Sequence, residues 1–198
     1  MARYEVRLSG SGGQGIIVAG IILAEAAGIY EGKEVCQTQA YGPEARGGAS
    51  KAEVVISDRE IDYPKAMQPD VLLAMNQKAC DTYAHDLKPG GLLVADSTLV
   101  HDLPARNTIA LPFTRIARQE LGKEMVANIV ALGALAKISG VVSLANLEKA
   151  VLARVPPGTE ELNRRALAAG VAAAQEFLRA KVLRCLDNSL ESKEEGLL

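Results

Sequence analysis

The apolar positions at the start of the chain predict a strand followed by a helix. Tyr4, Val6 and Leu8 alternate with charged residues, as in a half-buried strand over residues 3–9. Over residues 16–28, apolar and small residues recur at the spacing of one helix face. The glycine-rich stretch between these two segments is therefore expected to form a strand-to-helix turn.

Further runs predict strands at residues 34–39, 52–56, 71–75, 92–96 and 108–111. The runs at 71–75 and 92–96 are apolar on both faces and end in polar residues, as interior parallel strands do, and a helical pattern at 77–87 joins them. This alternation predicts an α/β fold, in which a single domain contains a Rossmann-like, mostly parallel sheet flanked by helices. Asn76 and Asp96, at the carboxyl ends of two strands, are expected to line a ligand crevice.

The remainder of the chain is predicted to be helical. Apolar spacing, with breaks at glycine and proline, predicts helices at residues 113–121, 124–139, 144–154 and 159–181. The polar residues at the carboxyl terminus are expected to fray. The sequence thus predicts one domain over residues 1–186, with a helical C-terminal half, and a flexible acidic tail over residues 187–198.

Composition and charge narrow the class of protein. With 198 residues, of which 48% are hydrophobic, the chain is long enough for one sizeable core. Its net charge is −2, and basic and acidic residues are well mixed along the chain, so no broad positive field attracts nucleic acid or an anionic membrane. Neither partner is expected. No apolar run reaches about 18 residues and no signal peptide is recognisable, so we expect a cytoplasmic protein.

The cysteines and histidines do not indicate a metal centre. Cys36, Cys80 and Cys185 are odd in number and lack Cys-x-x-Cys spacing, which argues against a disulfide framework, a zinc site and an iron–sulfur cluster. His85 and His101 have no evident metal partner in the sequence. We therefore expect no metal in this chain and assign no residue as a catalyst.

The glycine-rich turn is suited to an anion, because bare backbone can be approached closely and the start of a helix attracts negative charge. We expect a phosphate-bearing ligand, with candidate contacts at Gly10, Ser11, Gly12, Gly13, Gln14 and Gly15. An alanine or valine at position 12 is expected to crowd the turn. A nicotinamide dinucleotide is disfavoured, because the second strand ends without the acidic residue that would hold its ribose. A turn needed only for close packing is the alternative.

A second stretch of unusual composition follows the predicted strand at 34–39. Arg46 is able to bind a phosphate through two hydrogen bonds, each worth about 1.5–3 kcal/mol, and Tyr41 can stack or donate a hydrogen bond. The alternative is an internal pair between Glu44 and Arg46, or a loop that only orders itself. The candidate ligand contacts in this stretch are Tyr41, Glu44, Arg46, Gly47 and Gly48.

Several motifs in order give the chain a family resemblance. The glycine turn at 10–15, the helix at 22–27, the Tyr-Gly-Pro-Glu-Ala-Arg-Gly-Gly stretch at 41–48 and the strand at 70–77 resemble the gamma subunit of 2-oxoacid:ferredoxin oxidoreductases. The stretch at 41–48 is most similar to the 2-oxoglutarate branch. The pyruvate, branched-chain 2-oxoacid and indolepyruvate branches stay open.

The resemblance implies an enzyme complex that converts a 2-oxoacid and coenzyme A to an acyl-CoA and carbon dioxide while reducing ferredoxin. It implies thiamine diphosphate and iron–sulfur clusters on alpha, beta and ferredoxin-like partner subunits, and a role for this chain in binding coenzyme A and in assembly. The isolated chain is then expected to be inactive and to self-associate, for example as a homodimer. A free-standing nucleotide-binding protein is the alternative of a different class.

Overall fold

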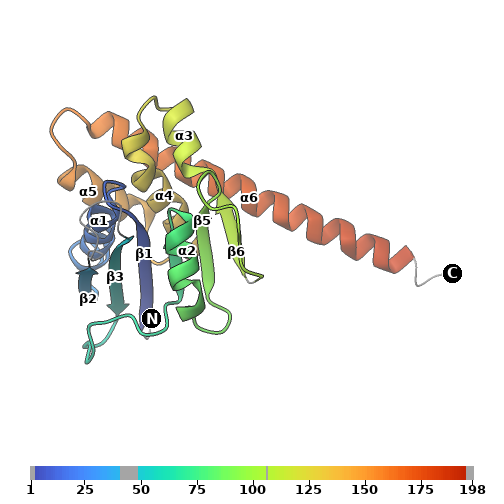
Figure 1. Cartoon of the computed structure of the whole chain (residues 1–198), viewed down its shortest axis with the longest axis horizontal. Coiled ribbons are helices and arrows are strands. Elements are labelled where there is room, and N and C mark those ends of the chain that lie inside the picture. The colour runs from blue at the N-terminus through green and yellow to red at the C-terminus, as the bar shows by residue number, and fades with distance from the viewer. Residues whose placement is uncertain (1–2, 41–48, 106, 195–198) are drawn as a thin grey trace.

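The computed structural model describes residues 3–40, 49–105 and 107–194, with side chains described up to residue 183 apart from that of Ala49. One mixed sheet forms the centre, and helices cover both of its faces (Figure 1). The elements are β1 (Tyr4–Ser11), α1 (Ile16–Gly28), β2 (Glu34–Ala40), β3 (Ala49–Ser57), β4 (Val71–Ala74), α2 (Gln77–Tyr83), η1 (Ala84–Asp86), β5 (Leu92–Asp96), β6 (Thr108–Leu111), α3 (Phe113–Gln119), η2 (Glu124–Val126), α4 (Ala127–Ser139), α5 (Leu144–Arg154) and α6 (Glu160–Glu194).

The predicted α/β class with a mostly parallel sheet is confirmed. The strand order is β2-β3-β1-β4-β5-β6, and β1, β4, β5 and β6 pair in parallel. Strand β3 is antiparallel to both of its neighbours, β1 and β2. The stretch that joins β2 to β3 is too short for a crossover helix, so the two strands form an antiparallel pair and β3 separates β2 from β1.

The register of this pair brings two distant parts of the sequence together. Ala49, the first residue of β3, pairs with Ser11 at the end of β1, and Ala40, the last residue of β2, pairs with Lys51. The end of β2 and the start of β3 therefore lie at the same end of the sheet as the glycine turn. Parallel strands in α/β proteins place their ligand crevice at this carboxyl end.

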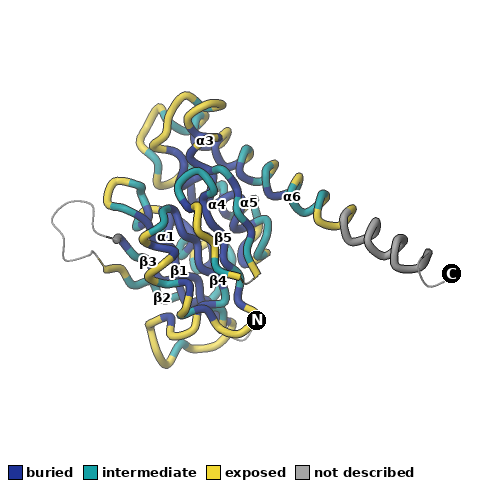
Figure 2. The backbone as a smooth tube through the Cα atoms, turned by 45° about the vertical axis from the view of Figure 1, so that its right-hand side comes forward, coloured by how far each residue is buried: buried dark blue, intermediate teal, exposed yellow. Residues whose placement is uncertain are grey.

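Alternate residues of the strands enter two separate cores. Val71 and Leu73 of β4 pack with α1, α4 and α5 on one face, whereas Leu72 and Ala74 pack with α2 on the other face. Burial is uninterrupted over residues 5–10 of β1, all of β4 and residues 127–136 of α4, which lie among the dark blue segments of Figure 2. Helix α1 lies close to β3 at Gly20, where a Cβ would be only 2.6 Å from the Cβ of Ala52. The absence of a side chain at Gly20 therefore allows this close packing of α1 on the sheet.

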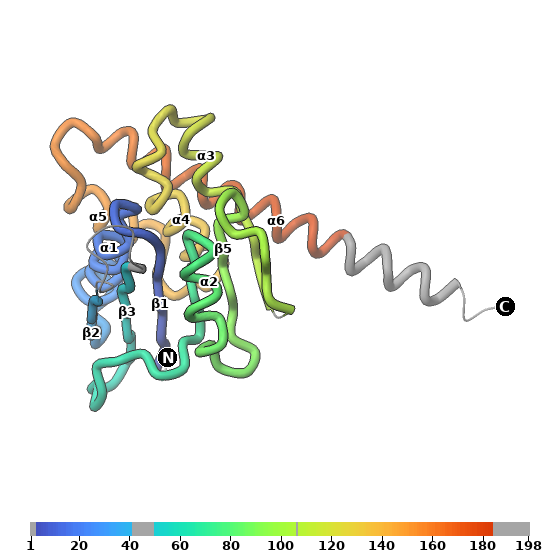
Figure 3. The backbone as a smooth tube through the Cα atoms, viewed as in Figure 1, coloured from blue at the N-terminus to red at the C-terminus, as the bar shows by residue number. Residues whose placement is uncertain are grey.

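Helix α6 is longer than predicted. Its first half crosses α4, and it then runs away from the rest of the chain (Figures 1 and 3). The predicted end near Lys181 is wrong, since the helix continues to Glu194 and includes residues 187–194 of the predicted tail. No glycine or proline occurs between Gly170 and Gly196, so the sequence contains no strong stop signal there. The division of the chain at residue 187 stays a prediction.

Two other predicted helices begin or end in tighter turns. The helix expected over residues 77–87 is α2 followed by the 3₁₀ turn η1, and the helix expected over 124–139 is the turn η2 followed by α4. Within the part of the chain that the structure describes, no helix is long and apolar enough to cross a membrane.

Candidate functional site

The turn after β1 leaves the start of α1 open. Strand β1 extends through Ser11, so the turn itself comprises residues 12–15, and Gly15 caps α1 in the left-handed conformation with a φ of 69°. No side chain caps this helix and no acidic residue lies in its first turn. Among the described residues, no acceptor is hydrogen-bonded to the N–H groups of Ile16, Ile17 and Val18. These donors and the helix dipole are available to an anion.

The glycines of this stretch are present for different reasons. A Cβ at Gly10 would lie 2.5 Å from Gln14 Oε1 and 3.0 Å from the Cβ of Met75, so packing excludes a side chain there. Gly13 and Gly15 have φ values of 89° and 69°, in the region that favours glycine. A Cβ at Gly12, by contrast, would have nothing within 4 Å. The expectation that alanine at Gly12 crowds the turn itself is therefore wrong, and a side chain there would project into open space.

Gln14 ties the turn to the next strand. Its Oε1 accepts a hydrogen bond from the backbone N–H of Ser11 at 2.6 Å, and its Nε2 donates to the carbonyl oxygen of Met75 at 3.1 Å. Asn76 adds a second tie, because its Nδ2 donates to Ser11 Oγ at 2.5 Å while its Oδ1 accepts from the N–H of Ala79 and so caps α2. Both amides hold the turn at the carboxyl end of β4.

Asn128 supports the turn from the helical side. Its Nδ2 donates to the carbonyl oxygen of Gly15 at 3.1 Å, and its Oδ1 accepts from the N–H of Ile129. A Cβ at Gly15 would overlap this amide. The start of α4 and the glycine turn thus lie against each other at one end of the sheet, as Figure 3 shows. The pairing of an asparagine with a glycine more than a hundred residues away carries no local sequence signal.

Asp96 has a structural role rather than the crevice-lining role expected of it. It is fully buried, and its carboxylate accepts hydrogen bonds from Thr98 N–H at 3.0 Å, Thr114 N–H at 3.1 Å and Thr114 Oγ1 at 2.5 Å. Because Thr114 lies in the first turn of α3, the carboxylate caps that helix and joins it to β5. Its acceptor oxygens are directed to the protein and away from a ligand.

Replacing Asp96 with alanine is expected to lower the free energy of unfolding by about 1–3 kcal/mol, because two backbone donors and a buried hydroxyl lose their acceptor. Denaturant unfolding of the purified chain measures this loss. Asp102, which is exposed, provides the control, since its replacement with alanine should change stability by less than about 0.5 kcal/mol. Equal effects of the two substitutions would contradict the capping role.

A buried charge network covers the second face of β1 and β3. The side chain of Arg7 is 5% exposed, donates to Glu53 Oε1 at 2.8 Å, pairs with Asp86 and lies 5.2 Å from the ring centre of Tyr83. Lys51 reaches the same carboxylate and lies over the same ring, at 3.0 Å and 5.5 Å. The alternation of residues along the strands predicts polar side chains on this face. Their burial, however, depends on contacts with residues 58–86, and no local sequence pattern predicts those contacts. The network is structural support.

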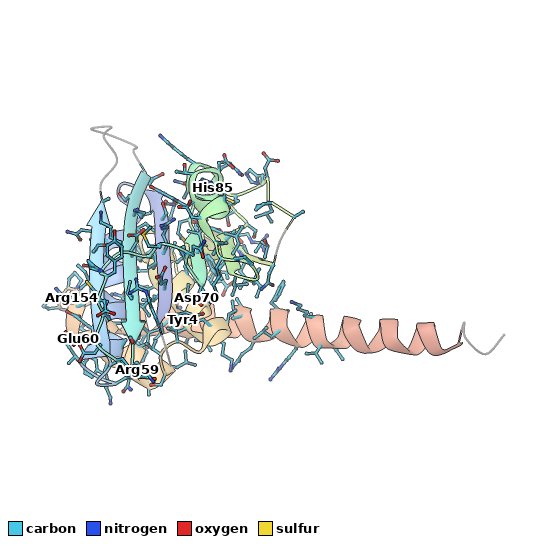
Figure 4. The ribbon with its side chains drawn as sticks, turned by 90° about the horizontal axis from the view of Figure 1, so that it is seen from below. Tyr4, Arg59, Glu60, Asp70, His85 and Arg154 are labelled. Atoms are coloured by element: carbon cyan, nitrogen blue, oxygen red, sulfur yellow. The ribbon has the colours of Figure 1, made fainter. Side chains whose placement is uncertain are left out.

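Other polar residues lie away from the glycine turn, and some of the candidate contacts lie outside the description. Tyr41, Glu44, Arg46, Gly47 and Gly48 lie outside the described residues. Asp70 accepts from the N–H of Glu5 at 2.8 Å beside Tyr4, at the amino end of the sheet and remote from the glycine turn (Figure 4). His85 is exposed on the α2 side of the molecule, far from Arg154 (Figure 4).

The cysteines that the structure describes do not form a cluster. Cys36 is half-buried in β2, and Cys80 is buried in α2. Within the described residues, no group of three or more histidine, cysteine or acidic side chains is arranged to hold a metal ion.

Comparison with known proteins connects this geometry to a family. Residues 5–173 match the family model described as pyruvate ferredoxin/flavodoxin oxidoreductase. The 2-oxoglutarate synthase subunit KorC of Methanocaldococcus jannaschii is 52% identical over 179 residues, which cover 88% of this chain and 96% of that protein. The residues that the family model matches include the glycine turn and Asn128.

Solved structures of similar fold and sequence support the same family. The gamma subunit of a keto/oxoacid ferredoxin oxidoreductase from Geobacter sulfurreducens is 54% identical with a TM-score of 0.79, covering 87% of this chain and 99% of that one. A 2-oxoglutarate:ferredoxin oxidoreductase from Magnetococcus marinus, solved with 2-oxoglutarate, coenzyme A and succinyl-CoA bound, is 26% identical with a TM-score of 0.78, covering 89% of this chain and 32% of that longer chain. The extent of these matches shows that the chain belongs to the pyruvate ferredoxin/flavodoxin oxidoreductase family.

Proposed function

We propose that this chain is the gamma subunit of a multi-subunit 2-oxoglutarate:ferredoxin oxidoreductase and that its glycine turn binds the phosphates of coenzyme A. The overall reaction converts 2-oxoglutarate and coenzyme A to succinyl-CoA, carbon dioxide and a proton, and two electrons pass to ferredoxin. The relatives named 2-oxoglutarate synthase, at 50–52% identity, support this choice of acid. Pyruvate, a branched-chain 2-oxoacid and indolepyruvate are the alternative substrates for the same fold.

The observation that carries the coenzyme A proposal is the uncapped start of α1 beside Gly12. Three N–H groups there have no acceptor among the described residues, and backbone at Gly12 is open to close approach. A pyrophosphate supplies the acceptors and the negative charge that such a site favours. Gln14 and Asn128 hold the turn from opposite sides, so the donors are fixed before the ligand arrives.

We also propose roles for residues beyond the turn. The register of β2 and β3 places both ends of the intervening segment beside the turn, which supports ligand contacts from Tyr41, Glu44, Arg46, Gly47 and Gly48. Thiamine diphosphate and iron–sulfur clusters, on alpha, beta and ferredoxin-like partners, would supply the decarboxylation and electron transfer. This chain then binds and orients coenzyme A, helps to assemble the complex in the cytoplasm, and is inactive alone.

A purification of the tagged chain from its native cells tests the function. We expect thiamine-containing and iron–sulfur partners to accompany it, and the preparation to reduce a one-electron acceptor only with coenzyme A and a 2-oxoacid. The rate with 2-oxoglutarate should exceed the rates with pyruvate, 2-oxoisovalerate and indolepyruvate by at least tenfold. Preference for another acid would overturn the choice of substrate. A solitary chain carrying a bound nucleotide would overturn the subunit assignment.

A further inference from the structure

The outer half of α6 extends away from the sheet and the other helices (Figure 1). Phe177 still packs against the larger core, whereas Val182 and Leu183 are 59% and 61% exposed. The helix continues to Glu194, so residues 178–194 form a projecting segment about 25 Å long. Most helical stability in proteins comes from the packing of an apolar face, so this segment indicates a partner outside the chain.

The apolar residues of the projecting segment recur at helical spacing. Leu178, Val182 and Leu183 border one shallow hollow on the helix surface. In the sequence, Leu186 and Leu190 continue this spacing at intervals of four residues from Val182. At about 100° per residue, these five positions fall within one half of the helix circumference. Such an apolar stripe on an exposed helix is typical of a helix that pairs with another helix.

The charge of the projecting segment changes sign along its length. Residues 178–184 contain three basic and no acidic residues, and residues 187–194 contain three acidic residues and one basic residue. An isolated helix is stabilised by the reverse order, because basic residues favour its carboxyl end. Arg179 and Lys181 form no ion pair with any residue that the structure describes. The order of charges is therefore suited to a partner helix with the opposite order.

We propose that the projecting segments of two copies of this chain pair in an antiparallel arrangement, with the apolar stripe at the contact. An antiparallel second copy has the required order of charges. The two-fold symmetry brings residues 178–184 of each copy beside residues 187–194 of the other, so unlike charges meet at both ends. A parallel pair would align like charges along its whole length. The pairing requires no ligand and does not depend on the proposed function.

Sedimentation equilibrium of the purified full-length chain tests the pairing. We expect a reversible dimer, and Val182→Glu should raise its dissociation constant at least tenfold, because a charge enters the apolar contact. The position is exposed, so the fold has room for glutamate. Met67→Glu is the matched control, because it adds the same charge at an apolar position of 63% exposure outside α6, and it should leave the constant within twofold.

Three results of this experiment would overturn the proposal. The first is a chain that stays monomeric up to its highest soluble concentration. The second is a dimer that Val182→Glu and Met67→Glu affect equally, which would assign the contact to another surface. The third is a monomeric wild-type chain whose Val182→Glu variant fails to join other subunits, which would assign the stripe to one of them.

An exchange of charges tests the antiparallel arrangement. In one variant, Arg179→Glu and Arg184→Glu make the first half of the projecting segment net acidic. In the other, Asp187→Lys and Glu191→Lys make its second half net basic. Each variant alone should dissociate at least tenfold more readily than the wild type, because like charges then meet. An equimolar mixture should form a mixed dimer about as tight as the wild-type dimer, which also shows that both variants are folded.

The effect of salt on the wild-type dimer distinguishes the two arrangements without a substitution. Raising the NaCl concentration from about 0.05 to about 0.5 M screens exposed charges, so an antiparallel dimer should dissociate severalfold more readily. A parallel dimer should instead become tighter, because its like charges are screened. A tighter dimer at high salt, or the absence of a mixed dimer in the charge exchange, would contradict the antiparallel pairing.

Discussion

Replacing Gly170 with alanine is expected to destabilise the protein severely. A Cβ at Gly170 in α6 would overlap the carbonyl oxygen of Val130 and lie 3.0 Å from the backbone nitrogen of Ala134, both in α4. Backbone atoms cannot rotate out of the way as a side chain can, so the two helices must move apart. Gly133 of α4 makes the reciprocal approach to the backbone of Leu167. Overpacking of this kind costs about 1–3 kcal/mol, and we expect a value at the upper end.

The measurement is denaturant unfolding of the wild-type and variant chains at one protein concentration. Ala168→Leu is the matched control, because it adds a larger side chain to an exposed position of the same helix and should change stability by less than about 0.5 kcal/mol. The gain in helix propensity from glycine to alanine, about 1 kcal/mol, opposes the predicted loss. A Gly170→Ala chain as stable as the wild type would contradict the close crossing of α4 and α6.

The substitutions Gly12→Asp and Gly12→Asn are expected to differ sharply in their effect on coenzyme A. Both side chains have similar size, and a Cβ at position 12 meets nothing within 4 Å, so both variants should fold. Only aspartate brings a negative charge next to the proposed pyrophosphate site. Because like charges in a binding site cost several kcal/mol, the KM for coenzyme A should rise about 10- to 100-fold in Gly12→Asp.

The KM for 2-oxoglutarate in the same assembled enzyme provides the internal control and should stay within about twofold of the wild-type value in both variants. A small rise for Gly12→Asn, below about fivefold, is compatible with steric approach alone. Equal effects of the two substitutions on coenzyme A would remove the electrostatic part of the account. A change confined to the KM for 2-oxoglutarate would assign the turn to the acid or to the interface near it.

Local patterns predicted most of the fold. Helices α1 and α5 and strands β5 and β6 have the predicted bounds, because each has clear periodicity and a glycine, proline or serine at its ends. The position of β3 between β1 and β2 had no such signal, since strand order depends on long-range pairing. The predicted last helix is shorter than α6 because the polar composition near the carboxyl terminus indicates a tail, although no glycine or proline there ends the helix.

The candidate site was predicted in outline but not in the roles of its residues. The glycine turn was located correctly, because a strand, a glycine run and a helix are contiguous in sequence. Its supports were not, because Asn128 and Met75 contact it from remote segments. Asp96 was assigned to the crevice from its place at a strand end, whereas the position of Thr114 on α3 decides its role.

The most direct test of the account is the structure of the assembled complex with coenzyme A bound. We expect the pyrophosphate of coenzyme A within hydrogen-bond distance of the backbone N–H groups at the start of α1, over Gly12, with Gln14 and Asn128 still bonded to the turn. Coenzyme A bound elsewhere, or a partner subunit filling the space above Gly12, would contradict it.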